Sequence, residues 1–132
     1  MPGTLEIFGS AVAADNDVLL RVTDLPVNEF GLFVTSLASA PAGTATFGNG
    51  YICFNTSVGM GRFFMANQIK HSGANGVITL DTNASEWSVT AIPTSTGSYA
   101  AMAGTRSYFQ AWHREQVGAG FNFSGAASVT WQ

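Results

Sequence analysis

Apolar and polar residues alternate along several short segments of the chain, and this alternation restricts the fold more than any other feature of the sequence. In residues 17–25 (DVLLRVTDL), Val18, Leu20 and Val22 would lie on one face of an extended strand and the intervening side chains on the other. Pro26 would end the strand, because proline has no N–H to donate to a sheet. Helical spacing of apolar residues is hard to find, so the sequence predicts an all-β protein.

Short segments of this kind, separated by turn residues, run from one end of the chain to the other. We expect strands at 4–10, 17–25, 29–37, 51–57, 61–70, 77–82, 86–93, 106–115 and 127–132. Asn49-Gly50 and Asn75-Gly76 precede two of them and suit the positive backbone angles of tight turns. Neither a linker nor a repeat of fixed period is apparent. We therefore predict one domain over residues 1–132, an antiparallel two-sheet sandwich with Greek-key or jelly-roll-like connections.

The segment at 106–115 carries large apolar groups on both of its expected faces. Tyr108 and Trp112 share one face, whereas Phe109 and Ala111 share the other. We expect Phe109 and Ala111 to enter the core. Tyr108 and Trp112 would then lie under a neighbouring loop or against a second subunit.

Charge is scarce in this chain, and its scarcity bears on possible partners. Charged residues make up 10% of the sequence, against about 25% in an average globular protein. The formal net charge is only −3, so copies of the protein repel one another weakly. Such a surface suits an extracellular protein or one that packs against itself. The basic residues are scattered, which argues against nucleic acid as a partner.

Membrane insertion is not expected either. No run of about 18 apolar residues is present, and residues 1–10 lack the charged start and apolar centre of a signal peptide. If the protein is exported, its signal has been removed or replaced by Met1.

The residues able to support chemistry are few. Cys53 is the only cysteine, so it is either a small buried apolar residue or a reactive or intermolecular thiol. A hydrolase would require His71 or His113 in a cleft beside a nucleophile, yet no G-x-S-x-G motif occurs. Zinc motifs are absent, and Cys53, His71, His113 and Met102 stand in the wrong order for a blue-copper site.

Calcium is the remaining metal to consider. Asp15 and Asp17 could offer oxygen ligands, although a solvated turn explains their spacing more simply. We therefore predict that the protein is not an enzyme and has no catalytic residues, cofactor or metal.

Two regions of the sequence resemble a known family. Residues 48–64 share a Gly-Asn-Gly turn, a cysteine and a Gly-Arg pair with it, through Gly48, Asn49, Gly50, Cys53, Gly61 and Arg62. Residues 106–131 share an aromatic strand and a closing strand, through Phe109, Gln110, Ala111, Trp112, Arg114, Asn122, Phe123, Ser124, Ala126, Ser128, Val129 and Thr130.

The family is a β-sandwich-like module found near the C-termini of large secreted proteins of planctomycetes, myxobacteria and related bacteria. Ser107, His113 and Glu115 depart from the family's usual Trp, Tyr and Asp. The resemblance implies a secreted, accessory and non-catalytic module.

Two functional hypotheses follow. The first is a non-enzymatic extracellular or cell-surface module that self-assembles into a filament, shell or oligomer, or docks to another surface protein. Its predicted interface residues are Tyr108, Trp112 and Trp131. The alternative is a carbohydrate-binding module for a polysaccharide, with an aromatic platform drawn from Trp87, Trp112, Trp131, Tyr51, Tyr99 and Tyr108.

Overall fold

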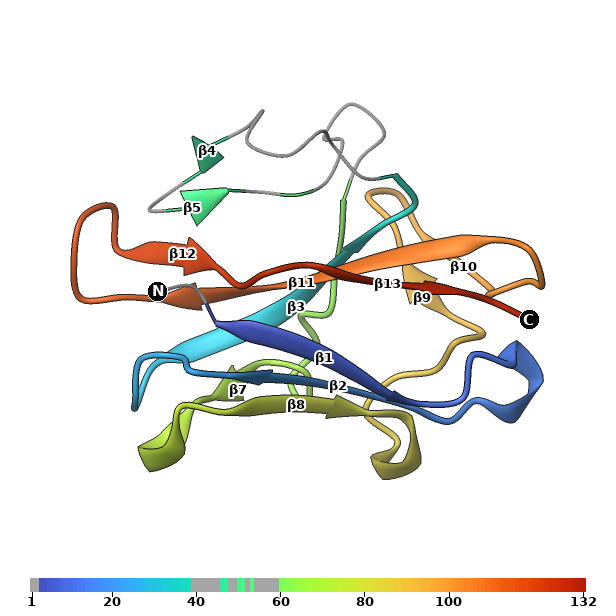
Figure 1. Ribbon diagram of the computed structural model, residues 1–132, viewed down its shortest axis with the longest axis horizontal. Helices are drawn as coiled ribbons and strands as arrows, with labels where there is room; N and C mark the ends of the chain where they lie inside the picture. The colour runs from blue at the N-terminus through green and yellow to red at the C-terminus, as the bar shows by residue number, and fades with distance from the viewer. Residues whose placement is uncertain (1–2, 39–45, 48–49, 52, 54–59) are drawn as a thin grey trace.

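Two antiparallel sheets stack face to face and form the body of the protein (Figure 1). The computed structural model describes residues 3–38, 46–47, 50–51, 53 and 60–132. The smaller sheet has the order β1-β2-β8, with β1 at Thr4–Gly9, β2 at Val18–Thr23 and β8 at Ile78–Asp81. The prediction of an all-β antiparallel sandwich is confirmed.

The larger sheet is built around two long neighbouring strands, β3 (Phe30–Ser36) and β11 (Arg106–Arg114). β11 also pairs with β12 (Phe121–Phe123) and β13 (Ala127–Thr130), and β3 pairs with β6 (Gly61–Arg62) and β7 (Lys70–His71). The pairings β2–β8 and β3–β11 join segments far apart in the sequence, as crossing connections between two sheets require.

Smaller elements complete the described structure. Two short hairpins consist of β4 (Thr46–Phe47) with β5 (Gly50–Tyr51) and of β9 (Ile92–Pro93) with β10 (Ser98–Tyr99). Three single turns of 3-10 helix, η1 (Ala13–Asp15), η3 (Gly73–Asn75) and η4 (Thr82–Ala84), lie in connections. Within the described ranges no helix is long and apolar enough to cross a membrane.

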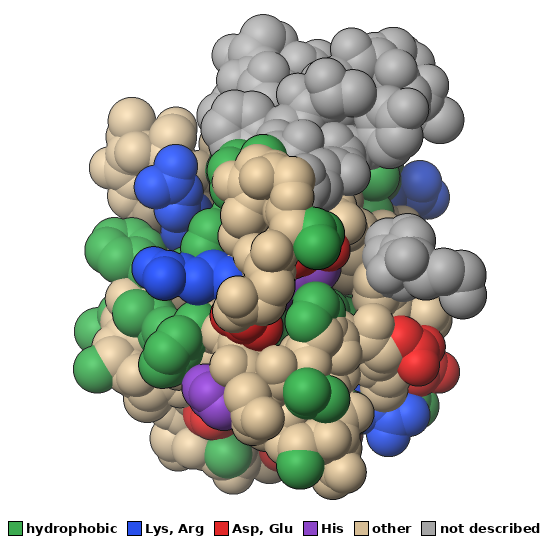
Figure 2. All heavy atoms as spheres, turned by 90° about the vertical axis from the view of Figure 1, so that its left-hand side faces the viewer, with side chains coloured by type: hydrophobic (Ala, Val, Ile, Leu, Met, Phe, Trp, Pro, Cys, Tyr) green, Lys and Arg blue, Asp and Glu red, His purple; other side chains and the backbone are tan. Residues whose placement is uncertain are grey.

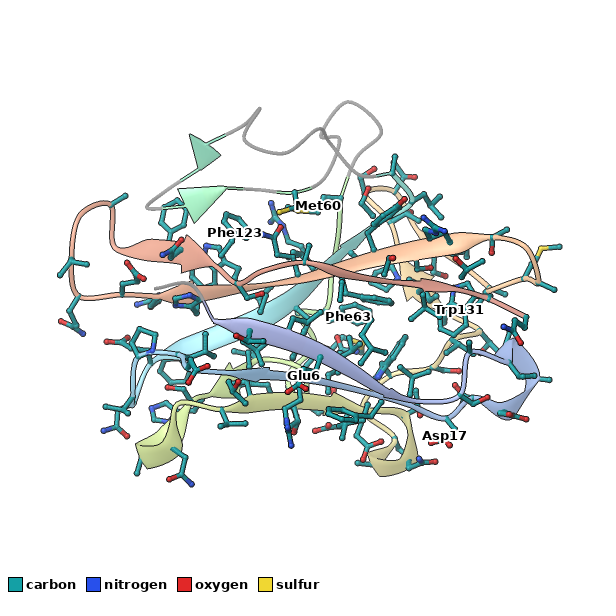
Figure 3. All side chains as sticks on the ribbon, in the orientation of Figure 1. Glu6, Asp17, Met60, Phe63, Phe123 and Trp131 are labelled. Atoms are coloured by element: carbon teal, nitrogen blue, oxygen red, sulfur yellow. The ribbon has the colours of Figure 1, made fainter. Side chains whose placement is uncertain are left out.

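The main core fills the space between the two sheets. Figure 3 shows Phe63 and Trp131 in this space. Trp87 packs edge-on against Phe63 and Phe109, with ring centroids 5.5 and 5.8 Å apart. The strands contribute alternate residues to the core, namely Leu5, Val18, Leu20, Val22, Phe33, Ile78, Leu80, Phe109, Ala111 and Val129. The alternation expected for residues 17–25 is thus confirmed.

Most of the expected strands are present with ends shifted by only a few residues. The predicted segments 4–10, 17–25, 29–37, 77–82, 106–115 and 127–132 correspond to β1, β2, β3, β8, β11 and β13. Of the segment 51–57, only residues 51 and 53 are described, and the rest lies outside the described residues. β4, β10 and β12 were not expected.

The strand predicted at 61–70 is wrong in its middle. Only its two ends, β6 and β7, pair with β3. Between them the chain turns, because Met65 O accepts hydrogen bonds from Gln68 N and Ile69 N. The side-chain oxygen of Gln68 also accepts a hydrogen bond from Met65 N at 3.1 Å. These local bonds replace a sheet ladder.

The strand predicted at 86–93 is also wrong, apart from β9 at its end. Val89 N donates to the Asn16 side chain at 2.9 Å rather than to a neighbouring strand. The Asn75-Gly76 pair does not form a primed hairpin turn: Gly76 has φ +65°, but Asn75 closes η3 and is not among the residues with positive φ. Asn49 lies outside the described residues.

Candidate interaction surface

The larger sheet is apolar on both of its faces. Its antiparallel register places Ala111 opposite Phe33 and Trp112 opposite Leu32. Ala111 and Phe33 belong to the main core, so Trp112 and Leu32 face away from it. On that side lies a second apolar group, here called the outer cluster, which comprises Leu32, Val34, Met60, Tyr108, Trp112, Phe121 and Phe123.

The side chains of the outer cluster lie across the sheet from the main core. Figure 3 shows Met60 and Phe123 on the opposite side of β11 from Phe63 and Trp131. Trp112 packs against Phe121 with ring centroids 5.9 Å apart. The expectation that Phe109 and Ala111 enter the core, while Tyr108 and Trp112 lie on the other face, is confirmed.

Exposed apolar residues extend this face beyond the outer cluster. Phe30 precedes Leu32 by two positions in β3 and therefore shares its face. Phe30 is 51% exposed and packs edge-on against His71, at 5.0 Å between ring centroids. Ile69, immediately before β7, is 47% exposed. Figure 2 shows hydrophobic side chains gathered on one flank of this end of the molecule, with Lys and Arg side chains among them.

One buried polar side chain, Gln110, joins Cys53 to the outer face. Its side-chain oxygen accepts a hydrogen bond from Cys53 N at 3.1 Å, and its Nε2 donates to Ser124 O at 2.7 Å. Nε2 also lies 3.5 Å from the Cys53 sulfur. Cys53 is a free, half-buried cysteine, so it is less buried than a core residue would be. Gln110 fixes the backbone of residue 53 above β11.

The three predicted interface residues fall in two different places. Tyr108 and Trp112 are half-buried in the outer cluster, and contact with a second molecule stays a prediction for them. Trp131 is 1% exposed, and its indole N–H donates to the Ser107 hydroxyl inside the core. The prediction for Trp131 is therefore corrected, because a side chain enclosed between the sheets has no surface to offer a partner.

Ser107 is a polar centre within the core and also contacts Tyr99. The Tyr99 and Ser107 hydroxyl oxygens are 2.6 Å apart. Burial raises the pKa of Tyr99 above its ordinary value of 10.0, and the hydrogen bond with Ser107 offsets part of that rise. The Tyr99 hydroxyl is thus engaged with the core, and its ring is half-buried against the core.

The aromatic platform of the carbohydrate hypothesis is not assembled from the tryptophans. Trp87 and Trp131 are buried in the main core, and only Trp112 reaches the outer face. The side chain of Tyr51 lies outside the described residues.

A different aromatic residue, Phe64, borders an open groove of about 720 Å³. Phe64 and Met65 are 65% and 68% exposed. Polar side chains, including Asn67, Ser85 and Ser88, line the groove beside them. This site was not predicted from the sequence, because residues 61–70 were expected to form one strand. The run Phe63-Phe64-Met65 was the available signal, since three successive large apolar residues cannot all face one core.

The histidines are not arranged for nucleophilic catalysis in the described part of the chain. His71 Nδ1 accepts a hydrogen bond from Gly73 N at 3.2 Å. His113 is buried, its Nδ1 lies 3.1 Å from Arg114 O, and its Nε2 has no hydrogen-bond partner among the described residues. Neither ring is bonded to a hydroxyl or thiol of any described residue, so the geometry that a hydrolase requires is not formed there.

The two candidate calcium ligands take part in local hydrogen bonds. Asp15 accepts a hydrogen bond from Ser10 at 2.6 Å, and Asp17 accepts one from Asn83 at 2.7 Å. Both lie at or next to η1, in the connection between β1 and β2, where a turn was expected. Across the described ranges, no three His, Cys, Asp or Glu side chains lie close enough together to hold a metal ion.

No protein-family model matches the chain, and neither a curated protein nor a solved structure shows significant similarity to it. The resemblance of residues 48–64 and 106–131 to the secreted bacterial module stays a prediction.

Proposed function

We propose that the protein is a non-enzymatic extracellular structural or interaction module, which self-assembles or docks to another surface protein through the outer face of its larger sheet. The observation that carries this proposal is the outer cluster, which is separate from the main core and in which Val34 and Phe123 are buried. Two exposed apolar residues lie close to it along the chain: Phe30, on the Leu32 face of β3, and Ile69, immediately before β7, which pairs with β3. Contiguous apolar surface on a soluble protein marks an interaction site more often than chance.

The chemistry of this face suits a protein contact. Trp112 and Phe121 are large, rigid side chains, and such aromatic groups supply much of the binding energy at interfaces. The low net charge of −3 limits repulsion between copies. The proposed extracellular location is supported by the scarcity of charge and by the resemblance to a secreted module.

Light scattering coupled to size-exclusion chromatography tests self-assembly over a range of protein concentrations. Phe30→Glu and Ile69→Glu place a charge on the exposed part of the face, and both variants are expected to remain folded but to lose assembly. Met102→Glu is the matched control. Met102 is also an exposed apolar residue, but it lies in the loop before Arg106, where β11 begins.

Docking to another surface protein is tested with the same variants by binding to cells that secrete the protein. The proposal is overturned if the wild-type protein remains monomeric at every concentration and also fails to bind these cells. It is equally overturned if Met102→Glu impairs assembly or cell binding as much as Phe30→Glu does.

Carbohydrate binding is a second candidate, supported by the groove beside Phe64. An exposed aromatic ring next to amide and hydroxyl side chains is suited to stacking on a sugar and donating hydrogen bonds to it. Polysaccharide pull-down with the wild type and Phe64→Ala tests this function. Retention by a polymer that is lost in Phe64→Ala supports it, whereas equal retention or no retention on any polymer excludes the groove.

A further inference from the structure

The outer cluster contains a hollow of about 310 Å³, lined by Leu32, Val34, Met60, Arg62, Trp112 and Phe123. At roughly 30 Å³ for each small group, this volume accommodates about ten non-hydrogen atoms. Of the six described residues that line it, five are apolar and two of these are aromatic. The hollow therefore has the size and walls of a site for a small apolar molecule.

Arg62 gives the hollow a chemical preference. In the β3–β6 pairing Arg62 lies opposite Val34, so its side chain leaves the sheet on the outer face. Arg62 is exposed, and its guanidinium forms no hydrogen bond or ion pair with the side chain of any described residue. Neither Asp nor Glu is among the described residues that line the hollow. The guanidinium is thus available to a carboxylate, which it can bind through two parallel hydrogen bonds.

We propose that this hollow binds a small monocarboxylate with an aromatic or aliphatic body. The body lies against Trp112 and Phe123, and the carboxylate pairs with Arg62 at the edge of the hollow. Aromatic bodies gain an additional stacking contact with the indole. This binding goes beyond the proposed function, since it requires neither assembly nor a protein partner.

The same walls disfavour other classes of ligand. A cation would be repelled by Arg62, and a sugar would leave its hydroxyls without hydrogen bonds against the apolar side chains. A free inorganic anion would pair with Arg62 but leave the hollow unfilled.

The experiment compares 3-phenylpropanoate with 3-phenylpropanamide, which has the same shape and no charge. Each is titrated by calorimetry into the monomeric protein. In parallel, the three tryptophan indole N–H signals are followed by NMR. Trp87 and Trp131 serve as internal references, because their indole N–H groups donate to Leu80 O and to Ser107 within the core. We expect the carboxylate to shift the Trp112 signal selectively and to bind about tenfold more tightly than the amide.

Arg62→Gln is expected to remove the tenfold preference and leave weak binding of both compounds. Arg106→Gln is the control, since Arg106 is exposed and bonds to Thr130 at the other end of β11. It should keep the preference. Equal binding of acid and amide by the wild type overturns the proposal, as does a selective shift of Trp87 or an unchanged preference in Arg62→Gln. These outcomes are independent of the assembly measurement, which uses neither ligand nor Arg62.

Discussion

Trp131 and Ser107 are joined by a hydrogen bond inside the core, where the indole N–H donates to the serine hydroxyl over 2.9 Å. Ser107 lies in β11. Trp131 directly follows β13, which pairs with β11. The same hydroxyl is hydrogen-bonded to Tyr99, which lies in β10. One small side chain therefore connects three parts of the chain.

Replacing this serine tests how much the polar centre stabilises the fold. Ser107→Ala leaves the buried N–H of Trp131 without an acceptor, so the free energy of unfolding should fall by about 1–3 kcal/mol. Urea unfolding followed by fluorescence measures the change. Ser128→Ala, on the exposed side of β13, is the control and should stay within about 0.5 kcal/mol of wild type. Equal stability of the two variants would contradict the role assigned to Ser107.

Tyr99 should make the protein sensitive to alkali. Its pKa in the folded state is raised by burial, whereas the unfolded chain ionises near 10.0. Well below pH 10 the Tyr99 hydroxyl is protonated in both the folded and the unfolded state, so its contribution to the free energy of unfolding is fully present. As the pH rises from about 10 through the folded pKa, only the unfolded state releases its proton, so stability falls.

Urea unfolding at a series of alkaline pH values checks this expectation. Tyr99→Phe has no ionisable hydroxyl and should lose stability less steeply above pH 10 than the wild type does. Parallel stability curves for the two proteins in this range would show that Tyr99 does not contribute.

Gly61 is required where β6 passes the β9 hairpin. A Cβ atom at this position would lie 1.9 Å from the backbone oxygen of Pro93, which cannot rotate away. We expect Gly61→Ala to destabilise the protein by about 3 kcal/mol or more, through displacement of the backbone. Gly97→Ala is the matched control, because open space surrounds that position, and it should change stability by less than about 0.5 kcal/mol. Thermal or urea unfolding of both variants measures the difference.

Two tryptophans should differ in how much they stabilise the monomer. Trp87 is buried between Phe63 and Phe109, so Trp87→Ala should cost about 3–5 kcal/mol. Trp112 is half-buried and packs mainly against the outer cluster, so Trp112→Ala should cost about 1–2 kcal/mol. Unfolding at a concentration where the protein is monomeric separates the two values. Similar losses would mean that Trp112 belongs to the structural core.

The alternation of side chains was sufficient to predict the strands that pair over most of their length. β2 and β11 show this best, since their inward residues were identified from spacing alone. The segments 61–70 and 86–93 could not be predicted in this way. Their conformations depend on the hydrogen bonds of Gln68 to Met65 and of Asn16 to Val89, and a pattern of apolar residues contains no information about such bonds.

The candidate surface was predictable only in part. The two-faced pattern of β11 correctly placed Tyr108 and Trp112 away from the core. The contribution of Phe30 became visible only through the pairing of β3 with β7, which joins residues distant in sequence. Trp131 was predicted to be an interface residue, but it is buried and bonded to Ser107, a partner that the spacing of residues does not identify.

The pairing of β3 with β11 also affects how the protein folds as it leaves the ribosome. Thr35 donates its hydroxyl to Tyr108 O across 73 positions of sequence, so the longest pairing of the larger sheet cannot form until β11 has been synthesised. Until then, β3 exposes Leu32, Phe33 and Val34 on an unpaired edge, which favours association between nascent chains. Folding of the larger sheet should therefore be more efficient when β3 stays shielded from other chains until β11 is available.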